Sequence, residues 1–316
     1  MRTIRVGHYS PRTLGVLDEV RAHAAATAAS ARFVTINTEV IERYARALPL
    51  HEASQPALDP ATHYVGEPEA TLAYVITLDA INFGSGYFPR LRKRPGMSGY
   101  FTVASSLKDC FDIRGVLSAD DLQKLTIRDC ARIFGQTLDD PAVAELMGLF
   151  ARALNDLGQY HDTAFGGSFR QLADASEGSA ERLAELLAEM PFYQDVGFYK
   201  RAQLTAADLS LAGVSAFRDL DRLTIFADNL VPHVLQVDSV LVYAPELRGR
   251  IEREELLPAS SAEEREIRAC ALHAVELMRD CLQRVNSMQL DYLLWNRGQA
   301  ASYKALPRHR TRTVFY

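Results

Sequence analysis

Isolated polar side chains inside apolar and aromatic stretches are the places in this sequence where chemistry could occur. A buried carboxylate or lysine costs free energy unless it has a partner, so each one needs a reason. In the first such stretch, DAINFG, Asp79 and Asn82 fit two interpretations: a helix end, where such side chains bond local backbone, or a pocket wall. The stretches of this kind cover residues 79–84, 198–204, 223–232 and 290–296.

Two neighbouring cations follow two aromatic residues in the second stretch, FYKRAQL. Lys200 could bind an anion such as phosphate as a point charge, and Arg201 could bind it with its planar fork of donors. The alternative is a helix start at which both cations are solvated, as most charged side chains are.

Carboxylates interrupt the third and fourth stretches. Asp228 lies in LTIFADNLVP, and it fits either the N-cap of a helix or a desolvated carboxylate in a pocket beside Phe226. Asp291 and Trp295 are four residues apart and share a helical face. Asn296 lies about 140° further round from Asp291. We therefore expect one of Asp291 and Asn296 to point into a pocket and the other to lie at its rim.

The elements that must position these residues are mostly helical. Apolar residues recur every three or four positions across residues 262–285, which predicts a long amphipathic helix. A second helix is expected at 141–158, with Gly158 as its C-terminal stop. Capping pairs predict two shorter helices, one starting at Ser118 and Asp121 and one at Thr126 and Asp129.

Strand signals are few. Residues 20–48 are rich in alanine and predict two helices, and Tyr74–Leu78 is the best strand candidate. Residues 51–69 form the loosest stretch and are expected to be a surface loop. We therefore predict one mainly α-helical globular domain over residues 1–316, with at most a small β element.

Composition limits the class of protein. The chain has 316 residues, 48% of them hydrophobic, and 35 Lys and Arg against 40 Asp and Glu give a net charge of −5. This charge argues against a stable nucleic-acid partner. No apolar run approaches the roughly 20 residues of a membrane span, and the four cysteines form no CxxC pair. These features predict a cytoplasmic protein without a membrane partner, and the sequence shows no metal-ligand cluster.

Several of these stretches together resemble one known family. The chain is similar to the queuosine salvage proteins, which are queuosine 5'-phosphate N-glycosylases or hydrolases, from about His51 to Tyr316. The similarity is carried in order by DAINF, GSF, FYKRAQ, LTIFAD, EIRAC, LDYLLW and the final PRHRTRTVFY. It implies a mainly helical fold that resembles helix-hairpin-helix DNA glycosylases. Leu211–Ser215 is faintly similar to the hairpin of those enzymes, although Ser215 replaces its second glycine.

The resemblance also implies the site residues. Base and ribose contacts fall on five positions: His51, Phe226, Asp228, Asp291 and Tyr292. The family's catalytic carboxylate falls on position 296, where this chain has Asn296. An amide carries no charge to stabilise a ribosyl cation. Either Asp228 or Asp291 takes this role, or the chain is an inactivated form.

The implied reaction is hydrolysis of the N-glycosidic bond of queuosine 5'-phosphate, which releases the 7-deazaguanine base queuine for salvage into tRNA. Such a reaction passes through an oxocarbenium-like ribose and needs a carboxylate near the anomeric carbon. It also needs an aromatic surface for the base, which Phe226, Tyr292 and Trp295 can supply, and an anion site, for which Lys200 and Arg201 are the candidates. No metal or other cofactor is expected. The alternatives are a base glycosylase acting on nucleic acid and a non-catalytic queuosine-binding protein.

Overall fold

The secondary structure is mainly helical, as predicted. The computed structural model describes residues 15–52, 58–282 and 284–316. Fifteen α-helices and two short strands lie in this part of the chain. Strand β1 (Val34–Ile36) pairs antiparallel with β2 (Leu241–Tyr243), so the small β element exists, but not where the sequence suggested it.

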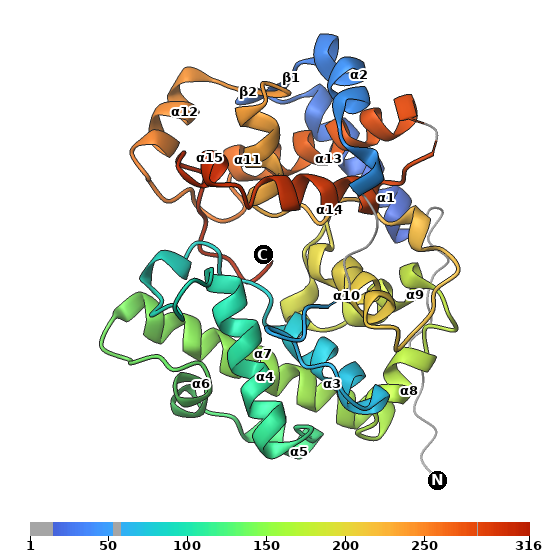
Figure 1. Ribbon diagram of the computed structural model, residues 1–316, viewed down its shortest axis with the longest axis vertical. Coiled ribbons are helices and arrows are strands. Elements are labelled where there is room, and N and C mark those ends of the chain that lie inside the picture. Colours follow the sequence, from blue (N-terminus) through green and yellow to red (C-terminus); the bar gives the residue numbers. More distant parts are fainter. Residues whose placement is uncertain (1–14, 53–57, 283) are drawn as a thin grey trace.

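The first two helices and the last five helices of the described chain form one half of the molecule, drawn at the top of Figure 1. Helix α13 is its centre and packs against α1, α2, α11 and α14, in keeping with the apolar stripe that predicted it. The two helices expected within residues 20–48 are α1 and α2, with β1 between them. The helices of this half are α1 (Val16–Ala29), α2 (Thr38–Ala47), α11 (Leu230–Val237), α12 (Pro245–Glu252), α13 (Ala262–Leu282), α14 (Ser287–Arg297) and α15 (Ala301–Lys304).

The middle of the chain forms the other half, drawn below (Figure 1). Helix α3 contacts α4, α7, α8 and α10 there, and each of its residues from Thr71 to Ala80 is buried. The strand expected at Tyr74–Leu78 is therefore wrong, because a helix buried on all sides has the same unbroken apolar run as a buried strand. The helices of this half are α3 (Pro68–Ala80), α4 (Gly99–Arg114), α5 (Ala119–Lys124), α6 (Ile127–Ile133), α7 (Pro141–Phe165), α8 (Phe169–Asp174), α9 (Ala180–Leu187) and α10 (Lys200–Leu211).

Helix ends follow the local sequence with one exception. Both predicted capping pairs form, since the hydroxyls of Ser118 and Thr126 each accept a hydrogen bond from the amide three residues later. Helix α7 continues through Gly158, where we expected it to stop. A Cβ at Gly158 would lie 2.8 Å from the Ala119 carbonyl oxygen, so this glycine allows α5 to pack closely on α7.

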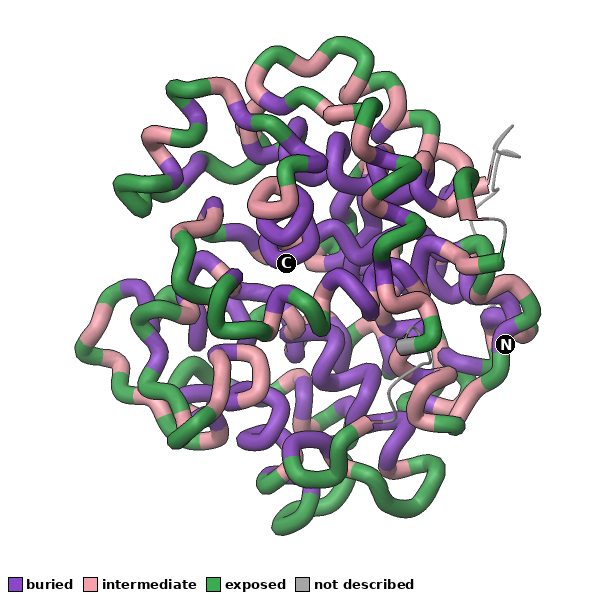
Figure 2. Tube along the Cα trace, turned by 45° about the horizontal axis from the view of Figure 1, so that its top comes forward, coloured by how far each residue is buried: buried purple, intermediate pink, exposed green. Residues whose placement is uncertain are grey.

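The carboxyl-terminal residues connect the two halves. Buried side chains from both halves form one continuous core, and the end of the chain lies over the middle of the molecule (Figure 2). The amide of Leu257 donates to the Arg310 carbonyl at 2.8 Å, and the amide of Gly84, in the other half, donates to the Tyr316 carbonyl at 3.0 Å. The single-domain organisation and the resemblance to helix-hairpin-helix glycosylases stay predictions. No helix among the described residues combines the length and the apolar character of a membrane span.

Candidate functional site

Lys200 is held at the start of α10 by a tight turn. Tyr199, which precedes the helix, has a φ of 48°, and the Lys200 amide donates to the Asp195 carboxylate at 3.2 Å. That carboxylate also forms two hydrogen bonds to Arg268 of α13, at 3.0 and 2.6 Å. The start of α10 is therefore fixed to the other half of the molecule, and the Lys200 side chain is buried.

Two of the sequence stretches are joined by an amide side chain. Gln203 of α10 accepts a hydrogen bond from the Thr224 amide at 2.9 Å and donates to the Thr224 hydroxyl at 3.0 Å. Both side chains are fully buried. This contact places LTIFAD directly beside FYKRAQ.

Asp291 of α14 lies at the end of the same segment. Its Oδ1 accepts a hydrogen bond from the Phe226 amide at 2.9 Å, and its side chain is 4% exposed. Burial, reinforced by the negative charge of Asp228, raises the pKa of Asp291 to about 8, although the Phe226 amide and Lys200 act in the opposite direction. Asp291 is therefore mostly protonated at neutral pH, and its free Oδ2 can carry the proton.

Asp228 takes the N-cap role that its sequence context allowed, and its role in a pocket stays a prediction. Its Oδ1 accepts hydrogen bonds from the Leu230 amide at 2.7 Å and the Val231 amide at 3.3 Å, so it caps α11. Its charge also acts on Lys200 and on Asp291. The side chain is only partly buried, which leaves this carboxylate accessible within the charged cluster.

Two further carboxyl groups complete the cluster around Lys200. Asp79, at the end of α3, is fully buried; it accepts a 3.3 Å hydrogen bond from Asn82, and its second oxygen has no partner among the described residues. Asp208, on α10, makes no hydrogen bond or ion pair through its side chain within the described part of the chain. Burial raises the pKa of both groups, and the charge of Asp79 adds to the effect on Asp208.

Asp208 was not found from the sequence. It lies in the helical run AADLSL, where it interrupts an apolar stretch just as Asp228 does. The same signal, a carboxylate within an apolar run, could have identified it. Its helical position adds to this signal, because Lys200 and Asp208 are eight residues apart and lie about 80° apart around the helix. We define the acidic cluster as Asp79, Asp208, Asp228 and Asp291 around Lys200.

Arg201 points into the protein interior. Its Nη1 donates to the carbonyls of Asp79 at 3.0 Å and Ala80 at 2.7 Å, and its Nη2 donates to the Phe192 carbonyl. Its guanidinium carbon also lies 4.4 Å from the ring centre of Tyr193. Both Nη atoms are thus bound to backbone carbonyls and the side chain is 2% exposed, so neither a solvated helix start nor a fork open to a phosphate fits Arg201.

Aromatic side chains border the acidic cluster on α14. Tyr292 packs edge to face on Phe226, with ring centres 6.3 Å apart, and Trp295 contacts Tyr100 and Phe101 of α4 at 6.4 and 6.3 Å. Trp295, Tyr292 and Tyr100 are partly exposed, whereas Phe226 is 4% exposed. Flat apolar surface is therefore available next to Asp291.

Asn296 and His51 both have exposed side chains. Asn296 is exposed on α14 while Asp291 is buried, which is the arrangement expected when one of the two points inward. His51 lies in the 3₁₀ turn Leu50–Glu52, directly before the undescribed residues 53–57. The functional roles of both residues stay predictions.

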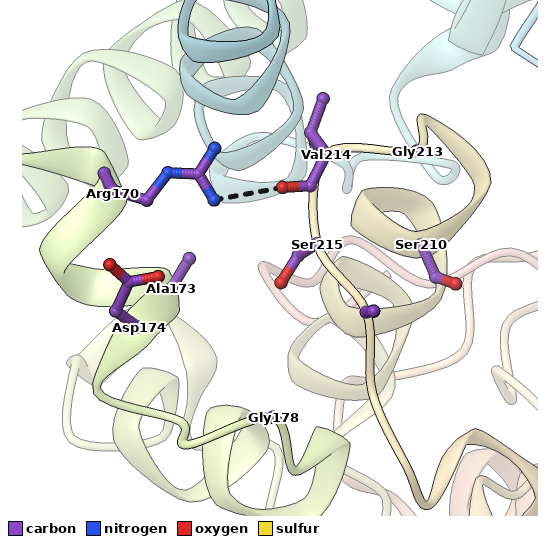
Figure 3. Close-up of a pocket in the computed structure, with 9 residues that line it drawn as sticks. Arg170, Ala173, Asp174, Gly178, Ser210, Gly213, Val214 and Ser215 are labelled. Atoms are coloured by element: carbon purple, nitrogen blue, oxygen red, sulfur yellow. Dashed lines mark hydrogen bonds between the residues drawn. The ribbon is translucent and has the colours of Figure 1, made fainter.

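A separate hollow opens on the surface. It has a volume of about 620 Å³ and lies between α8 and the turn after α10 (Figure 3). The turn is held by Arg170, whose Nη1 donates to the Val214 carbonyl at 3.1 Å. This is the Leu211–Ser215 segment compared above with a glycosylase hairpin. None of the residues that line the hollow belongs to the acidic cluster.

Comparisons with known proteins identify relatives that align over most of the chain. The family model "Queuosine salvage protein" matches residues 62–316. A protein of Sphaerobacter thermophilus is 35% identical over 96% of this chain and 98% of its own length, and one of Bos taurus is 32% identical over 79% and 83%. A Dictyostelium discoideum protein is 32% identical over 78% and 79%. All three are named queuosine 5'-phosphate N-glycosylase/hydrolase.

Proposed function

Because this chain belongs to the queuosine salvage protein family, we propose that it hydrolyses the N-glycosidic bond of queuosine 5'-phosphate and releases queuine. The observation that carries this proposal is the acidic cluster, in which four buried or half-buried carboxyl groups from three helices and one loop surround one lysine. Burying so many charged groups has a high cost, which is typical of a functional site.

Asp228 is the proposed group for the ribosyl cation. As the bond between the base and C1' breaks, positive charge develops on the ribose, and a nearby carboxylate stabilises it or takes a proton from the attacking water. The oxygen of that water forms the new bond to C1'. Asp228 is partly exposed, as is Asp208, and its charge also acts on Asp291, so it can reach a substrate without a change in fold.

Asp291 is the proposed proton donor to the departing base. A 7-deazaguanine has carbon in place of N7, so the usual basic nitrogen of a purine is missing and the leaving group needs a donor elsewhere. The raised pKa of Asp291 keeps a proton available at neutral pH. Asp291 then serves as the acid, and Asp228 as the base or charge stabiliser.

The remaining side chains bind and orient the substrate in this proposal. Tyr292 and Trp295, with Phe226 behind them, form the aromatic surface for the base, and stacking of this kind is worth about 1–3 kcal/mol per base. Lys200 supplies positive charge near the sugar phosphate. Arg201 supports α3 and α10 from inside. The partner is a small molecule, no metal or other cofactor is assigned, and four free cysteines are compatible with a reducing cytoplasmic location.

The test is direct. Purified protein is mixed with queuosine 5'-phosphate, and free queuine is followed by chromatography. We expect the amount of queuine released to exceed the amount of protein many times over, as it does when each enzyme molecule turns over repeatedly. Tight binding without release would indicate a binding protein, and release only from queuosine-containing nucleic acid would indicate a nucleic-acid glycosylase.

A further inference from the structure

The carboxyl-terminal segment contributes three arginines, and one of them differs from the others. Arg310 pairs with Glu254 at 3.1 Å, and Arg312 pairs with Glu145 at 3.6 Å while lying over the ring of Tyr87. Arg308 is partly buried, yet its side chain makes no hydrogen bond or ion pair with any residue that the structure describes. A desolvated arginine without a partner is costly, so its position requires an explanation.

The backbone around Arg308 is fixed beside the acidic cluster. The Asn229 side chain donates to the His309 carbonyl at 3.4 Å, which places this segment next to the residue that follows Asp228. His309 is 2% exposed and Thr311 is fully buried, so the segment cannot shift without opening the core. The charges acting on Arg308 are the attractive charge of Asp228 and the repulsive charge of Arg310.

Lys200 and Arg308 thus approach the same carboxylate from two halves of the molecule. Lys200 belongs to α10, and Arg308 belongs to the segment after α15. The charge of Asp228 acts on both cations. In a nucleoside 5'-phosphate, the phosphate and C1' belong to the same sugar, so a cation that holds the phosphate must lie close to the carboxylate that acts at C1'.

We propose that Arg308 binds the 5'-phosphate of the substrate and makes the enzyme select nucleotides over nucleosides. This inference rests on the proposed function and gives it a second cation in place of Arg201, whose two Nη atoms are already bound to backbone carbonyls. A guanidinium matches a phosphate with two parallel hydrogen bonds. Lys200 supplies positive charge nearby but also balances the carboxyl groups around it, and Arg308 provides the free positive charge.

The experiment compares queuosine 5'-phosphate with unphosphorylated queuosine in wild type, Arg308→Gln and Arg312→Gln. We expect Arg308→Gln to lower kcat/KM for the nucleotide by about 10- to 100-fold, as for loss of charge-assisted hydrogen bonds, with a loss at least tenfold smaller for the nucleoside. Arg312→Gln, a matched change four residues further along the segment, should lower neither. Arg308→Lys, which keeps the charge without the fork, should give an intermediate loss.

Equal losses for the two substrates in Arg308→Gln, or no loss for either, would overturn the assignment. Calorimetric binding of both compounds is measured in parallel, so that the inference is tested even where no base is released. If wild type binds the nucleotide but cleaves neither compound, the proposed function fails, while a selective loss of nucleotide binding in Arg308→Gln still supports the phosphate site.

Discussion

In the proposed mechanism, burial gives two chemically identical groups, Asp228 and Asp291, different tasks. The first is partly exposed and caps α11, while the second is buried beneath the Phe226 amide. Both could be suspected from the sequence, because each interrupts an apolar run. Their division of roles could not, because it depends on depth and on the charge of one acting on the other.

The pH dependence follows from Asp291. Its pKa, raised to about 8 by burial and then by Asp228, means that the protonated donor is present below that pH and is lost as the pH rises through it. We expect kcat/KM to fall on the alkaline side with a midpoint near pH 8, in a profile recorded from neutral to alkaline pH. Asp291→Asn, which cannot transfer a proton, should be slow and lack this decline. A wild-type profile that stays flat well above this midpoint would exclude Asp291 as the acid.

Asn296 offers a second test among single residues. Since its side chain is exposed on α14, a charge placed there is screened by solvent. We expect Asn296→Asp to change single-turnover release of queuine by less than about tenfold, because exposed charges contribute about 1 kcal/mol or less. A much larger gain would show that the catalytic carboxylate belongs at position 296, as the family resemblance implies. It would also show that Asp228 does not replace that carboxylate in this chain.

Other residue roles depend on packing that no local pattern reveals. Arg201 follows Lys200 in the sequence, but three backbone carbonyls and two aromatic rings surround it in the folded chain. Arg308 likewise lies among several basic residues near the end of the sequence, and nothing in that local pattern shows which of them is paired. Whether a cation is paired is decided by residues that are distant in sequence.

The helices and loops bring the motifs together through a few buried contacts. Gln203 links α10 to Thr224, Phe226 links that loop to α14, and Arg268 of α13 donates to the Ala227 carbonyl at 2.9 Å. Helices with one apolar face and clear caps could be predicted from sequence. Helix α3 could not, because it is buried on every face and has no amphipathic signal.

Close packing of α5 on α7 provides a test of the fold. Gly158→Ala would place a methyl group 2.8 Å from the Ala119 carbonyl oxygen and 2.9 Å from the Gln123 amide nitrogen. We expect it to lower the free energy of unfolding by about 1–3 kcal/mol. Gly148→Ala on the same helix is the control, since its methyl group would meet only Ile127 at 3.8 Å.

Urea denaturation of both variants measures the difference. The Gly148→Ala protein should be as stable as wild type or more stable by up to about 1 kcal/mol, because alanine favours helix over glycine. Equal stability of the two variants would mean that α5 does not approach α7 as closely as described.

Across the whole molecule, the acidic cluster lies where the two halves meet. Helices α3 and α10 supply Asp79, Lys200 and Asp208 from one half, while α14 and the start of α11 supply the other two carboxyl groups (Figure 1). The carboxyl-terminal segment bonds to both halves. We propose that the halves act as one domain, because a site assembled from both needs a fixed relative position.

The central claim is that this cluster hydrolyses queuosine 5'-phosphate and that Asp228 is its reactive carboxylate. Single-turnover release of queuine by wild type and by Asp228→Asn tests it most directly. The amide oxygen of Asn can still accept the hydrogen bonds from Leu230 and Val231, so the variant should fold and melt like wild type. We predict release by wild type and a rate at least about 100-fold lower in Asp228→Asn. A folded Asp228→Asn protein that releases queuine at nearly the wild-type rate would contradict the account.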